Sequence, residues 1–428
     1  MRAAFYECDI TPPLGCYLFG QGVPLYATDV QDRLYAKALV VEDEGKYAAI
    51  VCADVTCQND ELHDFVTARV QEYTGIPGEN VCVCVNHTHW GAPVKGDSIG
   101  ERDEAYVDVF NRLVADAVIL AYKRLEDASA TFGVGKLEGI SFNRNHILKD
   151  GRVITWGQRR DDLEGFFGTK DDDVCVMTFY AGEKPLGAIV NFSCHQACLP
   201  SAPAFSAYTG DFSSILSKEL KKIYGEDFVS VFVTGPQGDI NHIDPFLKTK
   251  YDGEHYRIMG RKLAAEAQKT IADAKPIRGR GVEARKETIA LPRRPLNEEI
   301  FRKCAEQYLN GYNSVLRLNN LVTYYAKPKS EQVDLTLQVL RIGGVHIYTM
   351  PGEPYSRFGL DVKAGDASEG CMVIALANGH TGYIPTPDCW APNCDIYEAS
   401  FSEGTYLIPE AGDRMVERLL EMAEKLDQ

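Results

Sequence analysis

Short apolar runs alternate with amphipathic stretches along most of the chain. Runs rich in β-branched residues predict buried strands at residues 36–42, 47–55, 81–85, 229–234 and 371–377. Stretches with apolar residues three or four positions apart predict helices at residues 59–73, 101–125, 212–224, 253–274 and 411–426. Two further strand-like runs meet at Gly343 and Gly344, which predicts a hairpin. Strands that alternate with helices favour a mixed α/β, layered fold.

The pattern contains no low-complexity linker and no repeat of solenoid period. We therefore expect a single domain over residues 1–428. Within it, residues 275–294 are basic and rich in turn residues, and residues 296–312 have the periodicity of a helix with a polar face. We interpret about residues 293–330 as a peripheral helical excursion from this domain.

Composition argues against several classes of protein. Apolar residues make up 45% and charged residues 25% of the 428 positions, as in a soluble globular protein. The formal net charge of −16 argues against a nucleic-acid partner and against stable membrane association. No run of about 18 consecutive apolar residues occurs, so the sequence predicts no transmembrane helix. The first residues also lack the apolar core of a secretory signal. We expect a cytoplasmic protein; the sequence does not indicate its oligomeric state.

The cysteine pattern fits that compartment. The chain has 13 cysteines, an odd number, and several of them, including Cys82, Cys84 and Cys175, lie inside apolar runs. We expect them to act as small buried hydrophobic residues rather than as halves of disulfides. No Cys-x-x-Cys pair with zinc-finger spacing occurs, which argues against a structural zinc site.

Two histidines stand at the end of one predicted strand. Residues 86–93 read Asn-His-Thr-His-Trp-Gly-Ala-Pro and follow the apolar run 81–85. In an extended backbone, residues two apart point to the same side, so we expect the imidazoles of His87 and His89 to share a face beyond the sheet edge. Such a pair suits a metal ligand with an acid–base partner beside it. The same pair also occurs as ordinary surface or core histidines, so other segments of the chain are needed to distinguish a metal site from these.

Four more segments combine an apolar strand with polar residues and a turn. They carry His195, the loop residues Asp239, Asn241 and His242, the carboxylate Glu353, and Tyr383. Each residue alone has a structural interpretation: a core histidine, a turn-shaping loop, a charge at a helix start, or a packed aromatic. Ligands of α/β sheets bind beyond the strand ends, so we expect these segments to converge. Two nitrogens, a carboxylate and an open position would then define a catalytic metal site.

The ordered set of motifs resembles the neutral ceramidases. The matching segments are residues 86–93, the strand that ends at His195, Gly-Asp-Ile at 238–240, Pro-Gly-Glu at 351–353, Gly-Tyr-Ile-Pro at 382–385 and Tyr-Glu-Ala-Ser at 397–400. The resemblance spans nearly the whole chain and implies the layered α/β fold of the neutral ceramidase catalytic domain. We expect a catalytic-domain homologue without the family's secretory signal and C-terminal immunoglobulin-like domain.

The resemblance also implies a set of site residues. The implied zinc ligands are His87, His195, Glu353 and Tyr383. Zinc would lower the pKa of a bound water and polarise a carbonyl. The second histidine of the first motif, His89, would face the reacting carbonyl. Arg144, within Phe-Asn-Arg-Asn at 142–145, would lie in the active site and anchor a polar or anionic group. Tyr397 would hold the scissile amide and its developing oxyanion, and either His89 or Tyr397 could shuttle a proton.

Two positions depart from the family pattern. The family loop reads Gly-Asp-Val-Ser-Pro-Asn, whereas residues 238–243 read Gly-Asp-Ile-Asn-His-Ile, so Asn241 stands in place of an active-site serine. Hydrolysis by a zinc-activated water needs no serine, so we expect hydrolysis to survive with different substrate handling. Trp90 replaces a small residue and serves either as a platform in the pocket or as core packing. We expect no second metal near Asp239, His242 and Asp244, since loop carboxylates after glycine usually cap turns.

These observations lead to one expected function and two alternatives. We expect a cytoplasmic zinc-dependent hydrolase that cleaves an amide, less readily an ester, in a small polar substrate by attack of zinc-bound hydroxide. The first alternative is a metal-dependent lyase or isomerase acting on a carbohydrate, with His89 or His242 as the base. The second is a binding protein that keeps the metal but has lost catalysis along with the serine.

Overall fold

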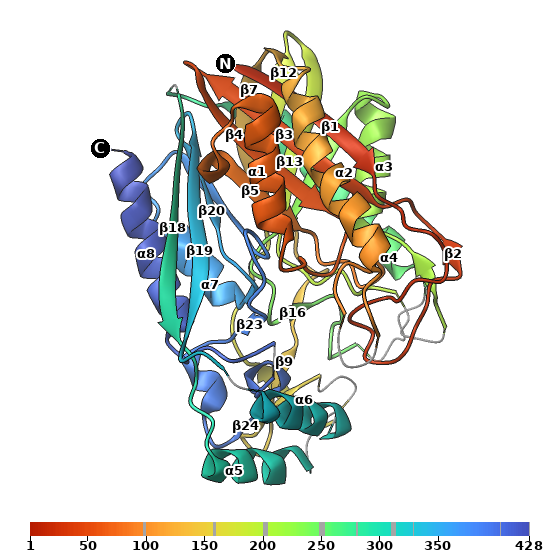
Figure 1. The fold of residues 1–428 in the computed structure, drawn as a ribbon, viewed down its shortest axis with the longest axis vertical. Coiled ribbons are helices and arrows are strands. Elements are labelled where there is room, and N and C mark those ends of the chain that lie inside the picture. The colour runs from red at the N-terminus through yellow and green to blue at the C-terminus, as the bar shows by residue number, and fades with distance from the viewer. Residues whose placement is uncertain are drawn as a thin grey trace.

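The computed structural model of the protein describes residues 1–96, 100–156, 160–199, 204–247, 253–279, 281–309, 314–327, 329–402 and 404–427. Three mixed sheets form its body (Figure 1). The first has the strand order β5 (Val81–Val85), β4 (Lys46–Ala53), β3 (Tyr35–Asp43), β1 (Arg2–Asp9) and β6 (Glu126–Asp127). The second has the order β15 (Val229–Thr234), β13 (Lys184–Phe192), β12 (Asp173–Ala181), β7 (Ser129–Lys136) and β17 (Lys275–Pro276). The third has the order β18 (Val282–Pro292), β19 (Gln332–Ile342), β20 (Val345–Thr349) and β22 (Gly370–Ile374).

Smaller strand groups lie beyond the ends of these sheets. A second four-stranded sheet has the order β11 (Leu163–Phe166), β9 (Asn145–Leu148), β10 (Val153–Thr155) and β24 (Cys394–Asp395). The two-stranded pairs are β14 (Ala207–Tyr208) with β2 (Asp29–Val30), β16 (Ile240–Asn241) with β8 (Phe142–Asn143), and β21 (Glu353–Pro354) with β23 (Tyr383–Ile384). Several of these short strands carry the candidate site residues.

One arrangement occurs in all three large sheets. An antiparallel hairpin is followed by a helix and then by a strand that runs parallel to the second strand of the hairpin. The connecting helices are α1 (Leu62–Thr74), α3 (Phe212–Tyr224) and α7 (Ser356–Gly365). The carboxyl ends of two parallel strands therefore lie at one edge of each sheet. A β-bridge between Cys84 and Ala377 joins this edge of the first sheet to that of the third. The Ala375 amide donates to the Thr234 carbonyl at 2.9 Å and joins the edge of the second sheet to that of the third.

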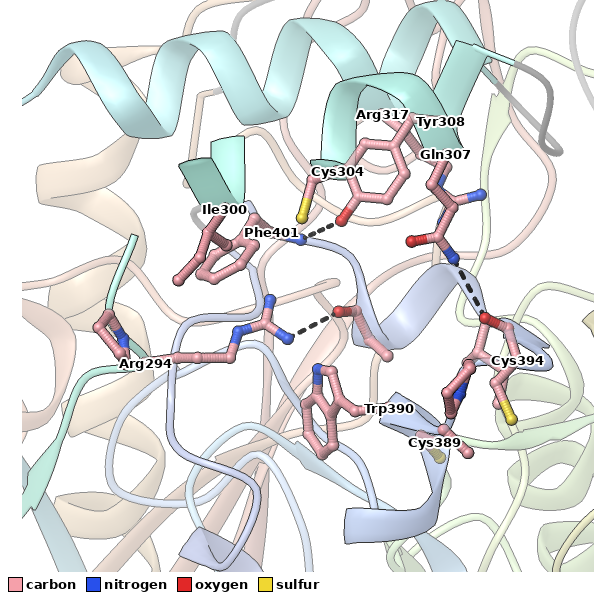
Figure 2. A pocket seen from close by; sticks show the side chains of 15 residues that line it. Arg294, Ile300, Cys304, Gln307, Tyr308, Arg317, Cys389, Trp390, Cys394 and Phe401 are labelled. Carbon is pink, nitrogen blue, oxygen red and sulfur yellow. Dashed lines mark hydrogen bonds between the residues drawn. The ribbon is translucent and has the colours of Figure 1, made fainter. Parts of the chain in front are cut away.

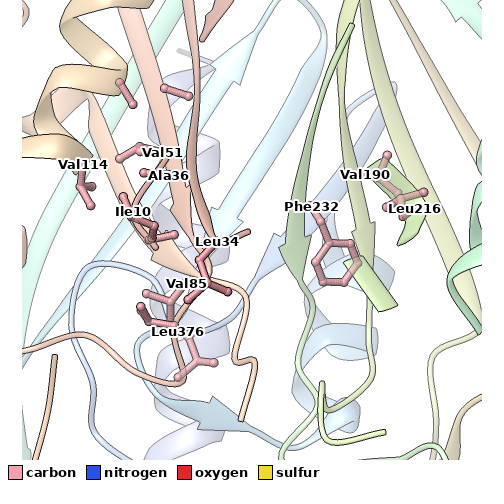
Figure 3. Packing of buried hydrophobic residues seen from close by; sticks show 14 of the residues in the cluster. Ile10, Leu34, Ala36, Val51, Val85, Val114, Val190, Leu216, Phe232 and Leu376 are labelled. Carbon is pink, nitrogen blue, oxygen red and sulfur yellow. The ribbon is translucent and has the colours of Figure 1, made fainter. Parts of the chain in front are cut away.

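The three sheets pack against one another and carry helices on their outer faces. Leu39 and Val41 of β3 point into the core shared by the sheets, whereas Ala38 and Val40 point to the helix side. Both faces are buried, which is why these strands read as continuous apolar runs. Part of the helix-side cluster is shown in Figure 3. The outer helices that complete these layers are α2 (Glu104–Tyr122), α4 (His255–Asp273) and α8 (Ala411–Leu426).

The structure corrects the interpretation of residues 275–294, of which residue 280 lies outside the described residues. This segment contains β18, which pairs with β19 along its whole length, from Val282 opposite Ile342 to Pro292 opposite Gln332. It is an edge strand, and edge strands carry charged side chains, which here resembled a turn-rich stretch.

Two helices connect β18 to β19 at the lower end of the molecule in Figure 1. They are α5 (Glu298–Leu309) and α6 (Ser314–Ala326). The periodicity at 296–312 predicted α5, although residues 310–312 lie outside the described residues. α6 also lies within residues 293–330, interpreted from the sequence as a helical excursion, although no helical periodicity was assigned to it. Among the described helices, none has both the length and the apolar character needed to cross a membrane.

A buried ion pair joins the third sheet to the end of α7 and makes stability depend on pH. Nδ1 of His346 lies 2.8 Å from Oδ1 of Asp366. Burial opposes ionisation of Asp366, but hydrogen bonds from His346 and other neighbours outweigh it and lower the pKa to about 2. Burial also opposes the charge on His346, but the hydrogen bond to Asp366 outweighs it and raises the pKa.

We expect His346→Gln to lower the free energy of unfolding by about 1–2 kcal/mol at pH 5.5 and by less at pH 9. The raised pKa of His346 stabilises the fold below the unfolded value of about 6.5 and is lost as pH rises through the folded pKa. The lowered pKa of Asp366 stabilises the fold above about pH 3.8 and is lost only as pH falls toward 2. Urea unfolding of both proteins at the two pH values measures the difference. An equal loss at both would contradict the assignment.

Candidate metal centre

Three segments that follow strands of different sheets meet at one point. His87 follows β5 of the first sheet, His195 follows β13 of the second, and Glu353 lies in β21, just after β20 of the third. The ligand atoms of His87, His89 and His195 lie within 4.8 Å of one another. Nε2 of His87 and Nε2 of His195 each lie 3.2 Å from Oε2 of Glu353. The structure therefore brings three imidazoles and a carboxylate into one group.

Hydrogen bonds on the far side of each ring fix the tautomers of the three histidines. Nδ1 of His87 lies 2.6 Å from the Thr56 carbonyl, and Nδ1 of His89 lies 3.0 Å from the Gly20 carbonyl. Nδ1 of His195 lies 2.8 Å from the carbonyl of Gln237. A carbonyl only accepts, so each Nδ1 carries the hydrogen and each Nε2 presents a lone pair. Backbone carbonyls orient metal-binding histidines in this way.

The inward-facing atoms of this group lack donors of their own. Nε2 of His87, Nε2 of His89 and Oε2 of Glu353 are buried and have no hydrogen-bond partner among the described residues. Lone pairs that face one another in a buried space are unfavourable unless a cation lies between them. A donor set of imidazole nitrogens and a carboxylate oxygen suits a divalent metal such as zinc. The residues present therefore fit a metal ion.

Charges within the group keep these side chains in their metal-binding forms. Burial lowers the pKa of His195 to about 4, with help from the positive charge of Arg144, and it lowers the pKa of His89 well below its usual value. Both imidazoles are therefore neutral at pH 7. Burial opposes ionisation of Glu353, but His87 and His195 outweigh that effect and hold its pKa well below the usual range. The carboxylate is therefore charged.

The backbone at His87 is not extended, contrary to the expectation from the sequence. β5 ends at Val85, and His87 has a φ of 71°, so the backbone there is left-handed rather than extended. The rings of His87 and His89 still meet, with centroids 5.0 Å apart and planes at 89°. A left-handed conformation is costly for a residue with a side chain and persists only when its surroundings hold it. Here the His87 amide donates to the Val55 carbonyl at 3.1 Å.

Glu353 and Tyr383 are placed by a short parallel pairing of β21 with β23. They are opposite each other in the register, and the Glu353 amide donates to the Gly382 carbonyl at 2.7 Å. Gly238 lies against this pairing, where a Cβ would come within 2.3 Å of the Glu353 carbonyl, so only glycine fits. The Tyr383 ring stacks on His195 with centroids 6.5 Å apart. Burial keeps the pKa of Tyr383 well above its usual value.

Arg144 lies beside the histidine group, between β8 and β9. Nη1 lies 3.3 Å from Nε2 of His195, and Nε donates to the buried carboxylate of Glu398. Glu398 also accepts from Oγ1 of Thr155 at 3.1 Å and from the Tyr355 hydroxyl at 3.3 Å. The charge of Arg144 is therefore already balanced within the protein. Its Nη2 has no partner among the described residues and stays available to a polar group.

Two aromatic side chains complete this side of the site. The ring of Tyr397 lies 6.1 Å from that of Tyr383 and 5.3 Å from that of Trp156. Burial raises the pKa of Tyr397 to about 12, so its hydroxyl remains a donor at neutral pH. The guanidinium of Arg144 lies 5.0 Å from the Trp156 ring. Neither Trp156 nor Glu398 was assigned a role from the sequence. Glu398 lies within the motif at residues 397–400, but that motif was used only for Tyr397, and no local pattern marks Trp156.

In the loop after β15, Asp239 and Asn241 make hydrogen bonds that hold the local structure. Oδ1 of Asp239 accepts from the Ser356 amide at 2.7 Å, at the start of α7, and Oδ2 accepts from Asn143 at 2.8 Å. The side chain of Asn241 is buried, and its oxygen accepts from the His242 amide at 2.6 Å. These bonds explain why a carboxylate follows Gly238.

Trp90 has a packing role rather than the role of an exposed platform. Only 2% of it is exposed, and it belongs to the cluster between the first sheet and its helices. Its ring meets that of Phe205 edge-on with centroids 6.0 Å apart. The centroid of the indole ring lies 6.5 Å from that of the His89 ring. Trp90 therefore supports the histidine motif from the core.

Comparisons with known proteins complete the description. No family model matches the sequence, and no curated protein matches it. Among solved structures, the protein is similar to the neutral ceramidase from Pseudomonas aeruginosa, with a TM-score of 0.76, 19% identity, and coverage of 99% of this chain and 75% of that chain. It is equally similar to a ceramidase complexed with C2, with a TM-score of 0.76, 19% identity, and coverage of 100% and 75%. The predicted mixed α/β fold is confirmed: this chain has the fold of the neutral ceramidase structures.

Proposed function

We propose that this protein is a zinc-dependent hydrolase that cleaves an amide bond, less readily an ester bond, in a small polar substrate. The observation that carries the proposal is the group of buried, donor-free atoms of His87, His89 and Glu353, with His195 beside them. The fold likeness to ceramidases, whose name denotes cleavage of the ceramide amide, supports the reaction class.

We assign the zinc ligands to His87, His195, Glu353 and Tyr383. Nε2 of His87 and Nε2 of His195 each lie 3.2 Å from Oε2 of Glu353, and the phenol ring of Tyr383 stacks beside His195. A set of two imidazoles, a carboxylate and one further oxygen is typical of catalytic zinc. His89 also belongs to the group of possible ligands. We assign it instead to proton transfer, and metal analysis of a His89 variant separates the two roles.

The protein's own groups account for binding, orientation and proton transfer. A zinc ion held here would polarise the scissile carbonyl and lower the pKa of a coordinated water. Nε2 of His89, neutral and unpartnered, can accept a proton and return it to the leaving nitrogen. The Tyr397 hydroxyl is a donor suited to the developing oxyanion. Nη2 of Arg144 has no partner among the described residues and can orient polar parts of the substrate, and we assign the side-chain amide of Asn241 to the same role.

The surroundings support a polar substrate. The side chains described around the metal group are imidazoles, carboxylates, a guanidinium, two phenols and the indole of Trp156. Such a lining suits hydrogen bonding and ring stacking. We therefore favour substrates such as acyl conjugates of amino acids over long-chain lipids.

A cytoplasmic location is part of the same proposal. All 13 cysteines lie in the described residues and are unpaired, as is usual in a reducing compartment. Mass spectrometry of protein alkylated in intact cells should find them reduced. Disulfides in protein isolated this way would contradict the assignment.

A substrate panel tests the reaction class. Zinc-loaded protein is incubated with short N-acyl amino acids, the matching esters, a carbohydrate set and ceramide, and the products are followed by NMR. The proposal predicts release of equal amounts of acid and amine from the acyl amino acids. A new double bond or an epimer without acid release would support a lyase or isomerase. Full zinc occupancy without turnover would support a binding protein.

Substitution of His89, the proton-transfer group, or of Tyr397, the oxyanion donor, should lower turnover while zinc stays bound. We expect His89→Asn to reduce kcat by about 10²–10⁴-fold, and Tyr397→Phe by about 10²–10³-fold. Elemental analysis should still find one zinc per chain in both variants. His63→Asn replaces a histidine on α1 that contacts Asp64 and Lys286 rather than the metal group; it serves as the control and should change neither quantity. Loss of zinc from the His89 variant would instead make His89 a ligand.

A further inference from the structure

A cavity lies between the α5–α6 pair and the C-terminal loops (Figure 2). Its volume is about 360 Å³, within the range of small-molecule sites. Arg294, Ile300 and Cys304 contribute one part of its wall, and Trp390 and Phe401 another. None of these residues takes part in the proposed zinc chemistry.

Arg294 is the feature that ordinary packing does not explain. Its Nη1 donates to the Ala399 carbonyl at 3.0 Å, whereas its Nε and Nη2 are buried without a hydrogen-bond partner among the described residues. No carboxylate of the described residues pairs with it. Burial lowers the pKa of Arg294 to about 10, so the side chain is still charged at neutral pH. A buried charge without a counter-ion is strongly unfavourable unless a ligand completes it.

The neighbours of Arg294 indicate which kind of ligand fits. The guanidinium lies 3.5 Å from the centroid of the Phe401 ring and 5.3 Å from that of Trp390, and Figure 2 shows it in the middle of the cavity with these rings on either side. Nε1 of Trp390 is a second buried donor without a partner. The other arginine of the wall, Arg317, is already paired with Asp395 at 2.6 Å. The cavity thus holds one uncompensated positive charge, free N–H donors and apolar walls.

We propose that this cavity is a second binding site, separate from the metal centre, for a small molecule that carries one carboxylate on an apolar or aromatic body. The planar fork of an arginine matches a carboxylate, and a single negative charge balances Arg294 without excess. The aromatic walls receive the body of the ligand.

The site also touches the segment that supports the metal centre. The turn η3 (Tyr397–Ala399) sends Tyr397 and Glu398 toward Arg144 and Tyr383, whereas Ala399 lines the cavity and accepts from Arg294. A ligand on Arg294 therefore contacts the same turn from the opposite side. Occupancy of the cavity is expected to alter turnover at the metal centre.

Titration calorimetry with phenylacetate tests the proposal. We expect saturable binding of one phenylacetate per chain to the zinc-loaded protein, and at least about tenfold weaker binding of the neutral isostere phenylacetamide. Inorganic phosphate, the second probe, should bind more weakly than phenylacetate, because it has no apolar body to fill the cavity. Equal affinity for the acid and the amide in the wild-type protein would overturn the proposal.

Variants locate the bound acid. Arg294→Gln should weaken phenylacetate binding about tenfold or more, and Trp390→Phe, which keeps a ring but removes the N–H, should weaken it a few-fold. Arg302→Gln removes one positive charge from the exposed face of α5 and is the matched control. Glu353→Gln should leave phenylacetate binding intact. Loss of binding in that variant alone would place the acid at the metal centre and overturn the proposal. If Arg294→Gln does not fold, Trp390→Phe and the acid–amide comparison still decide.

Discussion

Replacing Glu353 by glutamine is expected to reduce zinc content to far below one ion per chain and to lower amide hydrolysis by about a thousandfold or more. Oε2 of Glu353 lies 3.2 Å from Nε2 of both His87 and His195, so it is the anionic member of the group. A neutral amide removes the charge that balances the cation. A bound metal supplies several kcal/mol of transition-state stabilisation, and each 1.36 kcal/mol is a factor of ten in rate. Elemental analysis and turnover measure the two effects.

His87→Ala should behave in the same way, and His346→Gln is the control. His346 is also a buried histidine paired with a carboxylate, but it lies in β20 and contacts Asp366. Its replacement should lower stability and leave zinc content unchanged. If Glu353→Gln and His87→Ala both kept one zinc and full activity, the assignment of this group as a metal centre would be wrong.

The second large effect is on stability, at the ion pair behind the metal centre. Arg144→Met leaves the carboxylate of Glu398 buried without its cation, and the donors that remain to it within the described part of the chain are the hydroxyls of Thr155 and Tyr355. Removal of one partner from a buried pair typically costs about 3–5 kcal/mol, so we expect a loss of that size in the free energy of unfolding. Urea unfolding at pH 7 measures it.

A double variant separates the cost of a stranded charge from the value of the pair. Arg144→Met combined with Glu398→Gln removes both charges, and we expect it to be more stable than Arg144→Met alone. Arg152→Met removes an arginine from an exposed pair with Asp150 and should change stability by less than about 1 kcal/mol. If the two buried substitutions added independently, Glu398 would not be the counter-ion on which Arg144 depends.

Much of the fold follows from local patterns. The helix α3 and the strand β15 have the bounds that the periodicity of residues 212–234 predicts, and α8 has the predicted bounds as well. These segments contact neighbours on a regular face, so their apolar spacing records the contact. The edge strand β18 escaped prediction because four of its eleven residues are charged and only two are buried, so it lacks the apolar pattern of a core strand.

Some features of the candidate site can likewise be predicted from the sequence, and others cannot. Strand ends followed by His87, His195 or Glu353 are visible in the sequence, because a buried strand that runs into polar residues and a turn is a local signal. The left-handed backbone of His87 is not visible, since the hydrogen bond to Val55 and the packing around it impose that conformation. The pairing of Glu398 with Arg144 is not visible either, because the two residues lie 254 positions apart.

The sequence alone determined most of the strands and helices and which chemical groups stand at the strand ends. Those properties depend on residues within a few positions of one another. Only the tertiary structure decided that three sheet edges meet, that Arg144 is already neutralised, and that two guanidinium nitrogens of Arg294 are buried without a partner among the described residues. Those properties depend on distances between segments far apart in the chain, and burial turns such distances into large electrostatic energies.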